Sequence, residues 1–202
     1  MRMLLHACCG PCSIEPMRIF GEEGISYEIN YANSNIHPLA EYNLRIAALK
    51  DYATLQDIPV HEGNYDSLLW EKRVAPYGTE RPARCRACYR LRFEETAQTA
   101  VELGFDTIST TLTISPYQFT AIINEELERA AKQRGLGVLL RDFRTHYPSA
   151  TRISRDLGMY RQNYCGCRFS IIEAEAERAA RREARARAKE ERRQMASEKH
   201  IQ

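Results

Sequence analysis

Seven cysteines lie in three tight clusters that are separated by long stretches without cysteine. They are Cys8, Cys9 and Cys12, then Cys85 and Cys88, and finally Cys165 and Cys167. Short spacings let two thiolates reach one metal ion or cluster, and a fold can bring separate pairs together. The pattern therefore predicts a metal or redox site that is assembled from several loops.

Disulfides are the competing interpretation of these cysteines, and simple buried thiols are a third. The number is odd, a chain of 202 residues does not need covalent staples, and cysteine is far rarer than in disulfide scaffolds. Residues 1–7 are also too few to form a secretory signal ahead of the first cluster. We therefore expect a metal or redox role.

The second cluster is a Cys-x-x-Cys motif surrounded by arginines, namely Arg81, Arg84, Arg86, Arg90 and Arg92. Alone, such a motif could be a thioredoxin-like redox pair. The arginines could offset the negative charge of a thiolate-ligated cluster or bind phosphates. They could also form surface salt bridges with no further role. The sequence leaves these interpretations open.

The third cluster is too closely spaced for a structural zinc knuckle, which uses spacers of two or more residues. Gly166 permits backbone angles that could turn both thiols towards one centre. Polar and aromatic residues flank the pair, and this composition suits stacking on a nucleobase and hydrogen bonding to it. They are Tyr160, Arg161, Gln162, Asn163, Tyr164 and Arg168.

Seven thiolates exceed the needs of one tetrahedral ion. Four can hold a [4Fe–4S] cluster, and three remain for a second, mononuclear iron with an open position for a substrate oxygen. Because Cys8 and Cys9 are adjacent, on a strand they would point in opposite directions and could serve different metals. Our predicted partition gives Cys9, Cys12, Cys85 and Cys88 to the cluster, and Cys8, Cys165 and Cys167 to the second metal.

Short apolar strands alternate with amphipathic helices over much of the chain. Strands are predicted at residues 3–7, 25–32, 58–62, 105–111 and 138–140. One helix should begin at Ser13 as N-cap with Pro16 in its first turn, and another should open at Ser115 and Pro116. Alternation of this kind predicts an α/β fold, in which a parallel sheet carries helices on both faces.

Apolar residues at helical spacing define the buried faces of three of these helices. The first set is Leu39, Tyr42, Ile46, Leu49 and Ala53; the second is Phe93, Ala97, Ala100 and Val101, ended by Gly104; the third is Phe119, Ile122, Ile123, Leu127 and Ala130.

Sites in parallel sheets form beyond the carboxyl ends of the strands. The first cysteine turn and the segment TTLTISPY at 110–117 should therefore face one crevice. The first turn has no GxGxxG or GxxxxGK[ST] motif, so we do not expect a tightly held nucleotide there.

The net charge of +2 conceals an uneven distribution. Residues 173–202 carry nine Lys or Arg and seven Glu, which leaves residues 1–172 balanced at twenty against twenty. We expect a metal-binding catalytic domain at 1–172 and a charged helical tail at 173–202. The tail is either a solvated helix or an arm whose arginines contact phosphates. The chain has no run of about 18 apolar residues, so no membrane span is expected.

Six ordered motifs together resemble the QueH-type epoxyqueuosine reductases, the family that does not depend on cobalamin. The motifs are HACCGPCS at 6–13, NSNIHPLAEY at 33–42, CRACYRLR at 85–92, STTLTISPYQ at 109–118, DFR at 142–144 and YRQNYCGCRFS at 160–170. They span nearly everything except the tail, which makes the resemblance specific. Members of the family can carry a carboxylate at the position of Cys12.

The resemblance implies reduction of the epoxide of epoxyqueuosine, at the wobble position of tRNA, to the cyclopentene of queuosine and water. This would be the last step of queuosine biosynthesis, in the cytoplasm, with an external electron donor. It also implies a fold similar to the adenine-nucleotide α-hydrolase (HUP) fold, with a [4Fe–4S] cluster beside a second iron. Candidates for the proton donor, by residue type alone, are Tyr117, Tyr160 and Tyr164. Candidates for contact with substrate or tRNA are Arg84, Arg86, Arg161, Gln162, Asn163, Arg182 and Arg185.

Two other functions stay open at this point. One is a tRNA sulfur-transferring enzyme with an iron–sulfur centre on a related fold, which would normally need ATP and an SGGxDS-like loop that the sequence lacks. The other is a zinc-stabilised RNA-binding module without catalysis. Zinc without acid-labile sulfide in the purified protein would identify that module.

Overall fold

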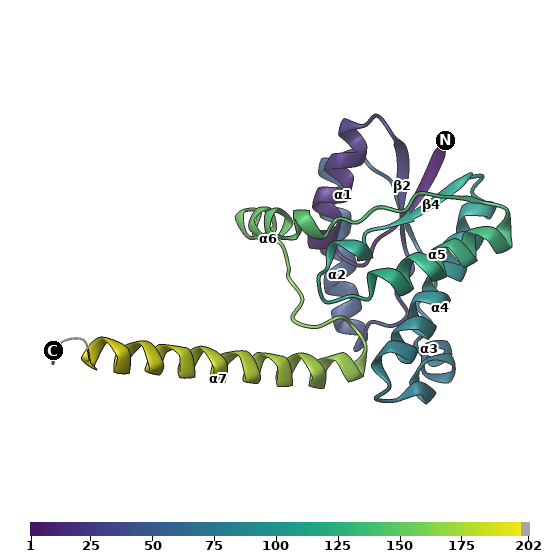
Figure 1. Cartoon of the computed structure of the whole chain (residues 1–202). Helices are drawn as coiled ribbons and strands as arrows, with labels where there is room; N and C mark the ends of the chain where they lie inside the picture. The colour runs from purple at the N-terminus through teal and green to yellow at the C-terminus, as the bar shows by residue number, and fades with distance from the viewer. Residues whose placement is uncertain (199–202) are drawn as a thin grey trace. The chain divides into compact units, whose positions relative to one another are not determined.

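The computed structural model describes residues 1–198, and its centre is one parallel sheet (Figure 1). The strands are β1 (Arg2–His6), β2 (Ser26–Tyr31), β3 (Val60–Glu62), β4 (Thr107–Thr110) and β5 (Gly137–Val138). Their order in the sheet is β3-β2-β1-β4-β5, and every neighbouring pair is parallel. The predicted α/β fold class is confirmed. Each predicted strand overlaps an observed one; β1 has the predicted length, and the other four are shorter.

Helices cover both faces of this sheet. The helices of the described residues are α1 (Gly10–Glu22), α2 (Leu39–Leu55), α3 (Ser67–Arg73), α4 (Arg81–Glu102), α5 (Thr120–Arg134), α6 (Tyr147–Asp156) and α7 (Arg168–Glu198); of these, α1 and α2 lie on one face of the sheet and α4 and α5 on the other. Side chains of β1 alternate between two cores: Met3 and Leu5 pack with residues of α1 and α2, whereas Leu4 packs with residues of α4 and α5. This alternation follows from the period of two in a strand. The predicted helices on both faces are confirmed.

Two predicted helix starts are wrong. Helix α1 begins at Gly10 with Cys9 as its N-cap, so Pro16 lies inside the helix, and the hydroxyl of Ser13 donates back to the Cys9 carbonyl at 2.9 Å. Helix α5 begins at Thr120, because the Ser115 hydroxyl instead accepts from the Tyr117 amide in a preceding turn. Serine satisfies backbone groups in turns as readily as at caps, so its presence alone does not fix a helix start.

The predicted buried faces hold with two exceptions at the helix ends. Leu39 and Val101 are 52% and 46% exposed, so neither belongs to a core. Helices α3 and α6 were not predicted. Helix α3 has seven residues and buries only Trp70, and one buried residue gives no periodic pattern to recognise.

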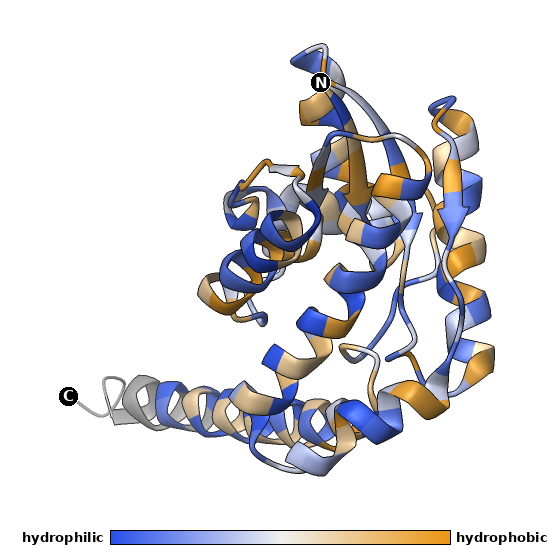
Figure 2. Ribbon diagram, turned by 90° about the vertical axis from the view of Figure 1, so that its right-hand side faces the viewer, coloured by the Kyte–Doolittle hydropathy of each residue, from blue (hydrophilic) through white to orange (hydrophobic). Residues whose placement is uncertain are grey.

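The chain divides into two compact units, Met1–Gln162 and the part from Asn163 onward. The boundary follows Gln162, whereas the sequence suggested a boundary after residue 172. Helix α7 is the main element of the second unit, and Figure 2 shows hydrophilic residues interspersed with less polar ones over its coloured part. Residues 199–202 of the predicted tail lie outside the described residues. Within the part of the chain that the structure describes, no helix is both long and apolar enough to cross a membrane.

Candidate metal centre

Cys8, Cys9 and Cys12 form a compact group of thiols at the carboxyl end of β1. Their sulfur atoms all lie within 4.8 Å of one another, and Cys8 Sγ is 3.7 Å from Cys9 Sγ. The expectation that Cys8 and Cys9 point in opposite directions is wrong. Both residues follow the end of β1, where the chain turns into α1, so strand alternation no longer applies to them.

The local sequence explains this turn. Cys9 is extended, with φ −176° and ψ 165°, and Pro11 stands in the first helical turn, where its missing amide hydrogen costs nothing. Gly10 is required by packing, because a Cβ there would lie 2.9 Å from the Ala48 carbonyl oxygen of α2. The N-terminus of α1 is therefore pressed against α2 at the thiols, where its dipole favours a negative charge.

The three thiols change one another's ionisation. Burial would raise the pKa of Cys9, but hydrogen bonds with Cys12 and Cys8 and the charge of Arg45 bring it well below 9.0. Hydrogen bonds with Cys8 and Cys9, together with burial, raise the pKa of Cys12 well above that value. The hydrogen bond with Cys12 lowers the pKa of Cys8, but Cys9 and burial raise it to about 12. Cys9 is therefore the first thiolate of the group, and a bound metal ion would displace the remaining protons.

Two fully buried arginines flank the thiols. Arg45 is 1% exposed and donates from Nε to Glu41 at 2.7 Å. Arg92 is 2% exposed and donates to Asn33 Oδ1 at 2.5 Å. Their positive charges lower the pKa of Cys9 and of Cys8 respectively. Buried guanidinium groups of this kind suit a site that carries several thiolates.

The neighbouring strand ends are fixed by a buried polar network. His6 shares hydrogen bonds with Thr110 Oγ1 at 3.0 Å and with the Ala32 carbonyl at 3.3 Å, and the Thr111 amide donates to the His6 carbonyl. Burial and the charge of Arg92 lower the pKa of His6, so it is a packed, neutral histidine. The network joins the end of β4 to the cysteine turn.

A cavity of about 70 Å³ opens beside Cys12. Ile114 lines it as well, so the first cysteine turn and the segment 110–117 face one crevice, as predicted. Its other lining residues are Pro11, Tyr147, Ala150, Thr151, Ser154, Arg161 and Gln162. Gln162 donates from Nε2 to Cys9 Sγ at 2.9 Å. Cys12 and Gln162 therefore connect the cavity to the thiol group within the first unit.

Cys85 and Cys88 lie one helical turn apart near the start of α4. Cys88 is 8% exposed and accepts a hydrogen bond from the Trp70 indole at 3.5 Å. Cys85 packs against the same core as Cys8. None of the seven cysteines, all within the described residues, is in a disulfide. The partition of thiols between two metals stays a prediction.

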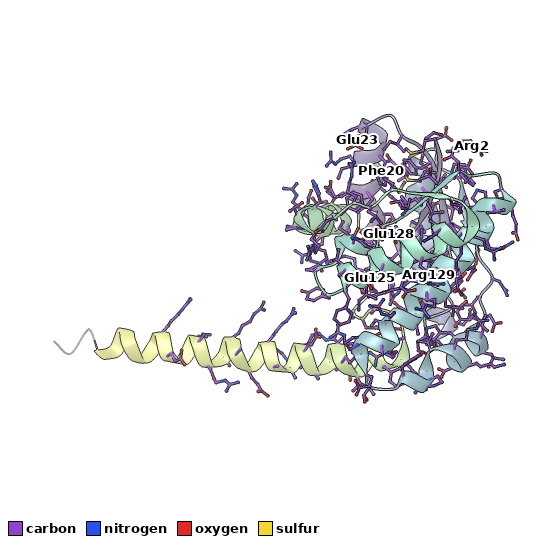
Figure 3. All side chains as sticks on the ribbon, turned by 45° about the vertical axis from the view of Figure 1, so that its right-hand side comes forward. Arg2, Phe20, Glu23, Glu125, Glu128 and Arg129 are labelled. Atoms are coloured by element: carbon purple, nitrogen blue, oxygen red, sulfur yellow. The ribbon has the colours of Figure 1, made fainter. Side chains whose placement is uncertain are left out.

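The arginines around this pair have protein partners. Arg86 donates to Glu125 at 2.6 Å and to Glu126 at 3.2 Å, and Arg90 donates to Glu126 at 2.9 Å. Arg84 is 1% exposed and donates to the Gly78 carbonyl at 2.6 Å. Figure 3 labels Glu125 and Arg129 on α5, the helix that supplies these carboxylates. Salt bridges between α4 and α5 are therefore the role that the structure gives to Arg86 and Arg90.

The three candidate tyrosines have different surroundings. Tyr160 donates to the Glu41 carboxylate, which also accepts from Arg45. Tyr117 is 45% exposed, and its ring centroid lies 6.1 Å from that of Tyr147. Tyr164 belongs to the second unit. The candidacy of Tyr164 as a proton donor therefore rests on the sequence pattern alone.

The third cysteine pair also belongs to the second unit. Cys165 is exposed and Cys167 is buried. Gly166 has φ +146°, a conformation that other residues rarely adopt, and its amide donates to the Ser170 hydroxyl at 3.1 Å. Arg178 donates to the Asn163 carbonyl at 2.7 Å. The described helix α7 carries Arg182 and Arg185 as exposed residues.

Sequence reasoning missed Arg45. Glu41 and Arg45 are four residues apart and lie beside the apolar stripe of α2, which is a spacing that forms ion pairs on a helix. That signal was present in the sequence. Its proximity to Cys9 was not, because it depends on how α2 packs against α1.

Comparison with known proteins agrees with this geometry. The family model for "Epoxyqueuosine reductase QueH" matches residues 3–173. The chain belongs to the QueH family. A QueH protein of Acinetobacter baylyi, named an epoxyqueuosine reductase, is 35% identical over 188 residues, covering 84% of this chain and 80% of the relative. The Thermotoga maritima QueH protein of the same name is 34% identical over 178 residues, covering 85% and 91%.

A solved structure shares the fold of this QueH chain. It is a predicted subunit of a tRNA methyltransferase from Methanocaldococcus jannaschii, with a TM-score of 0.53 and 12% sequence identity. The match covers 77% of this chain and 76% of the other. At this level of identity the likeness supports the α/β fold alone.

Proposed function

We propose that the protein reduces the epoxide of epoxyqueuosine in tRNA to the alkene of queuosine, in the cytoplasm. The observation that carries the proposal is the compact, partly buried group of Cys8, Cys9 and Cys12 at the carboxyl end of β1, in a chain of the QueH family. The reaction removes one oxygen atom as water and consumes two electrons and two protons. An external reductant must supply the electrons.

The donor set fits a thiolate-ligated iron centre. Three sulfur atoms lie within 4.8 Å of one another, two buried arginines offset negative charge, and a Cys-x-x-Cys pair stands near the start of α4. A [4Fe–4S] cluster held by these residues would supply electrons one at a time, and a second iron would supply Lewis acidity. We keep Cys9, Cys12, Cys85 and Cys88 as the proposed cluster ligands. Cys8, Cys165 and Cys167 remain the proposed ligands of the second iron.

The cavity beside Cys12 is the proposed place for the reacting ring of the substrate. Ile114 and Ala150 offer apolar surface, whereas Tyr147, Thr151 and Arg161 bring polar groups to its lining. Such a mixed lining suits a small hydroxylated hydrocarbon ring. Its position against Cys12 would hold the ring next to the metal-binding thiols.

Tyr160 is our first candidate for the proton donor. Its hydroxyl donates to Glu41, and Glu41 is paired with Arg45, whose charge acts on Cys9. A phenol in such a chain can release a proton and have it replaced through the carboxylate. Tyr117 and Tyr164 remain alternative donors.

The tRNA contacts that we propose are Arg161 and Gln162, which line the cavity beside Cys12, together with Asn163, Arg182 and Arg185 of the second unit. Arg161, Arg182 and Arg185 are exposed. Arg84 and Arg86 are engaged by Gly78 and by the carboxylates of α5, so we assign them to holding α4 in place. Exposed arginines bind phosphates and release counterions.

The test replaces Cys85 and Cys88 by Ala in protein handled without oxygen. We expect the visible absorbance of the cluster and turnover on epoxyqueuosine-containing tRNA to disappear together. Gln98→Ala, a change further along the same helix, should retain both. Turnover in the double variant without cluster absorbance would overturn the scheme.

A further inference from the structure

The two polar atoms of the Gln162 side chain have unlike surroundings. Nε2 lies 2.9 Å from Cys9 Sγ and 3.9 Å from Cys12 Sγ. Oε1 is buried and has no hydrogen-bond partner among the described residues. The amide therefore directs its donor to sulfur while its acceptor remains unsatisfied.

A side-chain amide can present either its N–H group or its oxygen at nearly the same shape, so the charge of the sulfur beside it decides which is favoured. The reverse orientation would place a carbonyl oxygen against sulfur. A neutral thiol is a weak acceptor and would give little reason to leave Oε1 unpaired, whereas a thiolate accepts a strong, charge-assisted hydrogen bond. The arrangement is thus suited to a Cys9 sulfur that carries negative charge, as a metal ligand does.

We propose that Gln162 is a positioning residue that raises the reduction potential of the metal group held at Cys9. This inference rests on the proposed function, because it assumes a redox-active metal group on that sulfur. Reduction adds one electron from the external donor to the metal group and makes its ligand sulfur more negative. An N–H···S hydrogen bond is stronger to the more negative sulfur and therefore stabilises the reduced state.

The position of Gln162 gives this bond a place in the reaction. Gln162 lines the cavity together with Cys12, while Cys9 itself is only 1% exposed. The Gln162 side chain thus lies between the proposed ring site and the Cys9 sulfur. A centre that is easier to reduce accepts electrons from a weaker external donor.

The test is a redox titration of the full-length holoprotein, followed by EPR and purified without oxygen. Gln162→Leu removes both polar atoms at similar volume, and Gln162→Glu places an acceptor near the sulfur. We expect the midpoint potential to become more negative in Gln162→Leu and more negative still in Gln162→Glu above the pKa of the new carboxyl group. Gln133→Leu, an exposed change on α5, should keep the wild-type potential.

Each outcome decides the inference. An unchanged potential in Gln162→Leu, with iron and sulfide retained, would overturn the role of Gln162 and leave the proposed function standing. If the Leu variant does not retain its metal, Gln162→Met, with a longer unbranched side chain, is titrated in its place and judged in the same way. Wild-type protein without a redox-active metal would instead overturn the proposed function itself.

Discussion

Two arginines of the first unit and one of the second have opposite environments. In the first unit, Arg45 and Arg92 are 1% and 2% exposed, and each donates to a fixed oxygen partner. In the second unit, Arg187 is 75% exposed and lies 3.9 Å from a carboxylate that is itself 73% exposed. The same side chain therefore lowers the pKa of a nearby thiol in one place and is available to a polyanion in the other. Packing, and not residue type, separates the two roles.

The largest expected effect comes from removing a buried arginine. Arg45→Met would leave the Glu41 carboxylate, which is 8% exposed, without its ion partner. Loss of one member of a buried pair costs about 3–5 kcal/mol of the free energy of unfolding. Urea denaturation of metal-matched samples measures this, with Arg134→Met at the exposed end of α5 as the control. Equal losses in the two variants would erase the distinction between buried and exposed arginines.

A second prediction concerns the partly exposed arginines that form ion pairs with Glu126. Burial would raise the pKa of Glu126, but hydrogen bonds from Arg90, Arg129 and Arg86 hold it at about 2 instead of 4.5. A lowered pKa stabilises the fold above pH 4.5, and the contribution is lost as the pH falls from 4.5 towards 2.

Comparison with Glu126→Gln isolates this contribution. At pH 6 the wild type should exceed the variant by about 2 kcal/mol in free energy of unfolding, after allowance for solvent screening. The gap should narrow steadily in denaturation series run at decreasing pH. A gap that does not depend on pH would show that the ion cluster does not hold the carboxylate ionised.

The third prediction concerns the exposed arginines of α7. Truncation before Arg182 removes seven Lys or Arg and four Glu. We expect tRNA affinity to fall about tenfold at low salt and log K to depend less steeply on log salt, by about 0.9 for each lost phosphate contact. Filter binding at several salt concentrations measures both. Replacing Arg182 and Arg185 by Gln in the full chain is the control that keeps the helix. Unchanged tRNA binding in both variants would show that the arginines of α7 do not contact tRNA phosphates.

The smallest expected effect is on the exposed ion pair of that helix. Glu183→Gln should change the free energy of unfolding by less than about 0.5 kcal/mol at physiological salt, because exposed pairs four residues apart are weak. Thermal unfolding of the variant beside the wild type measures it. A loss comparable to that of Arg45→Met would contradict the assignment of these charges to solvent.

The sequence predicted the fold where periodic patterns were strong and failed where one residue had several possible partners. The apolar run of β1 and the stripes of α2, α4 and α5 were sufficient for a parallel sheet covered on both faces. Ser13 and Ser115 misled, because each hydroxyl bonds within a turn or back along its helix instead of capping. Local residue preference cannot choose between these options.

The sequence predicted which residue types form the site, but not how their side chains are arranged in space. Cys8, Cys9 and Cys12 are close in sequence, so their grouping followed from spacing. The bond from Gln162 to Cys9 joins residues 153 positions apart, and the contribution of Arg45 depends on the packing of α2. Both require the tertiary structure.

The most direct test of the account is the content of iron, zinc and acid-labile sulfide per chain in protein purified without oxygen. One cluster and one further iron predict about five irons and four sulfides. That result would justify the assay on epoxyqueuosine-containing tRNA. Zinc without sulfide would contradict the account, because the cysteines would then form a structural site and the proposed reduction would have no source of electrons at the thiols.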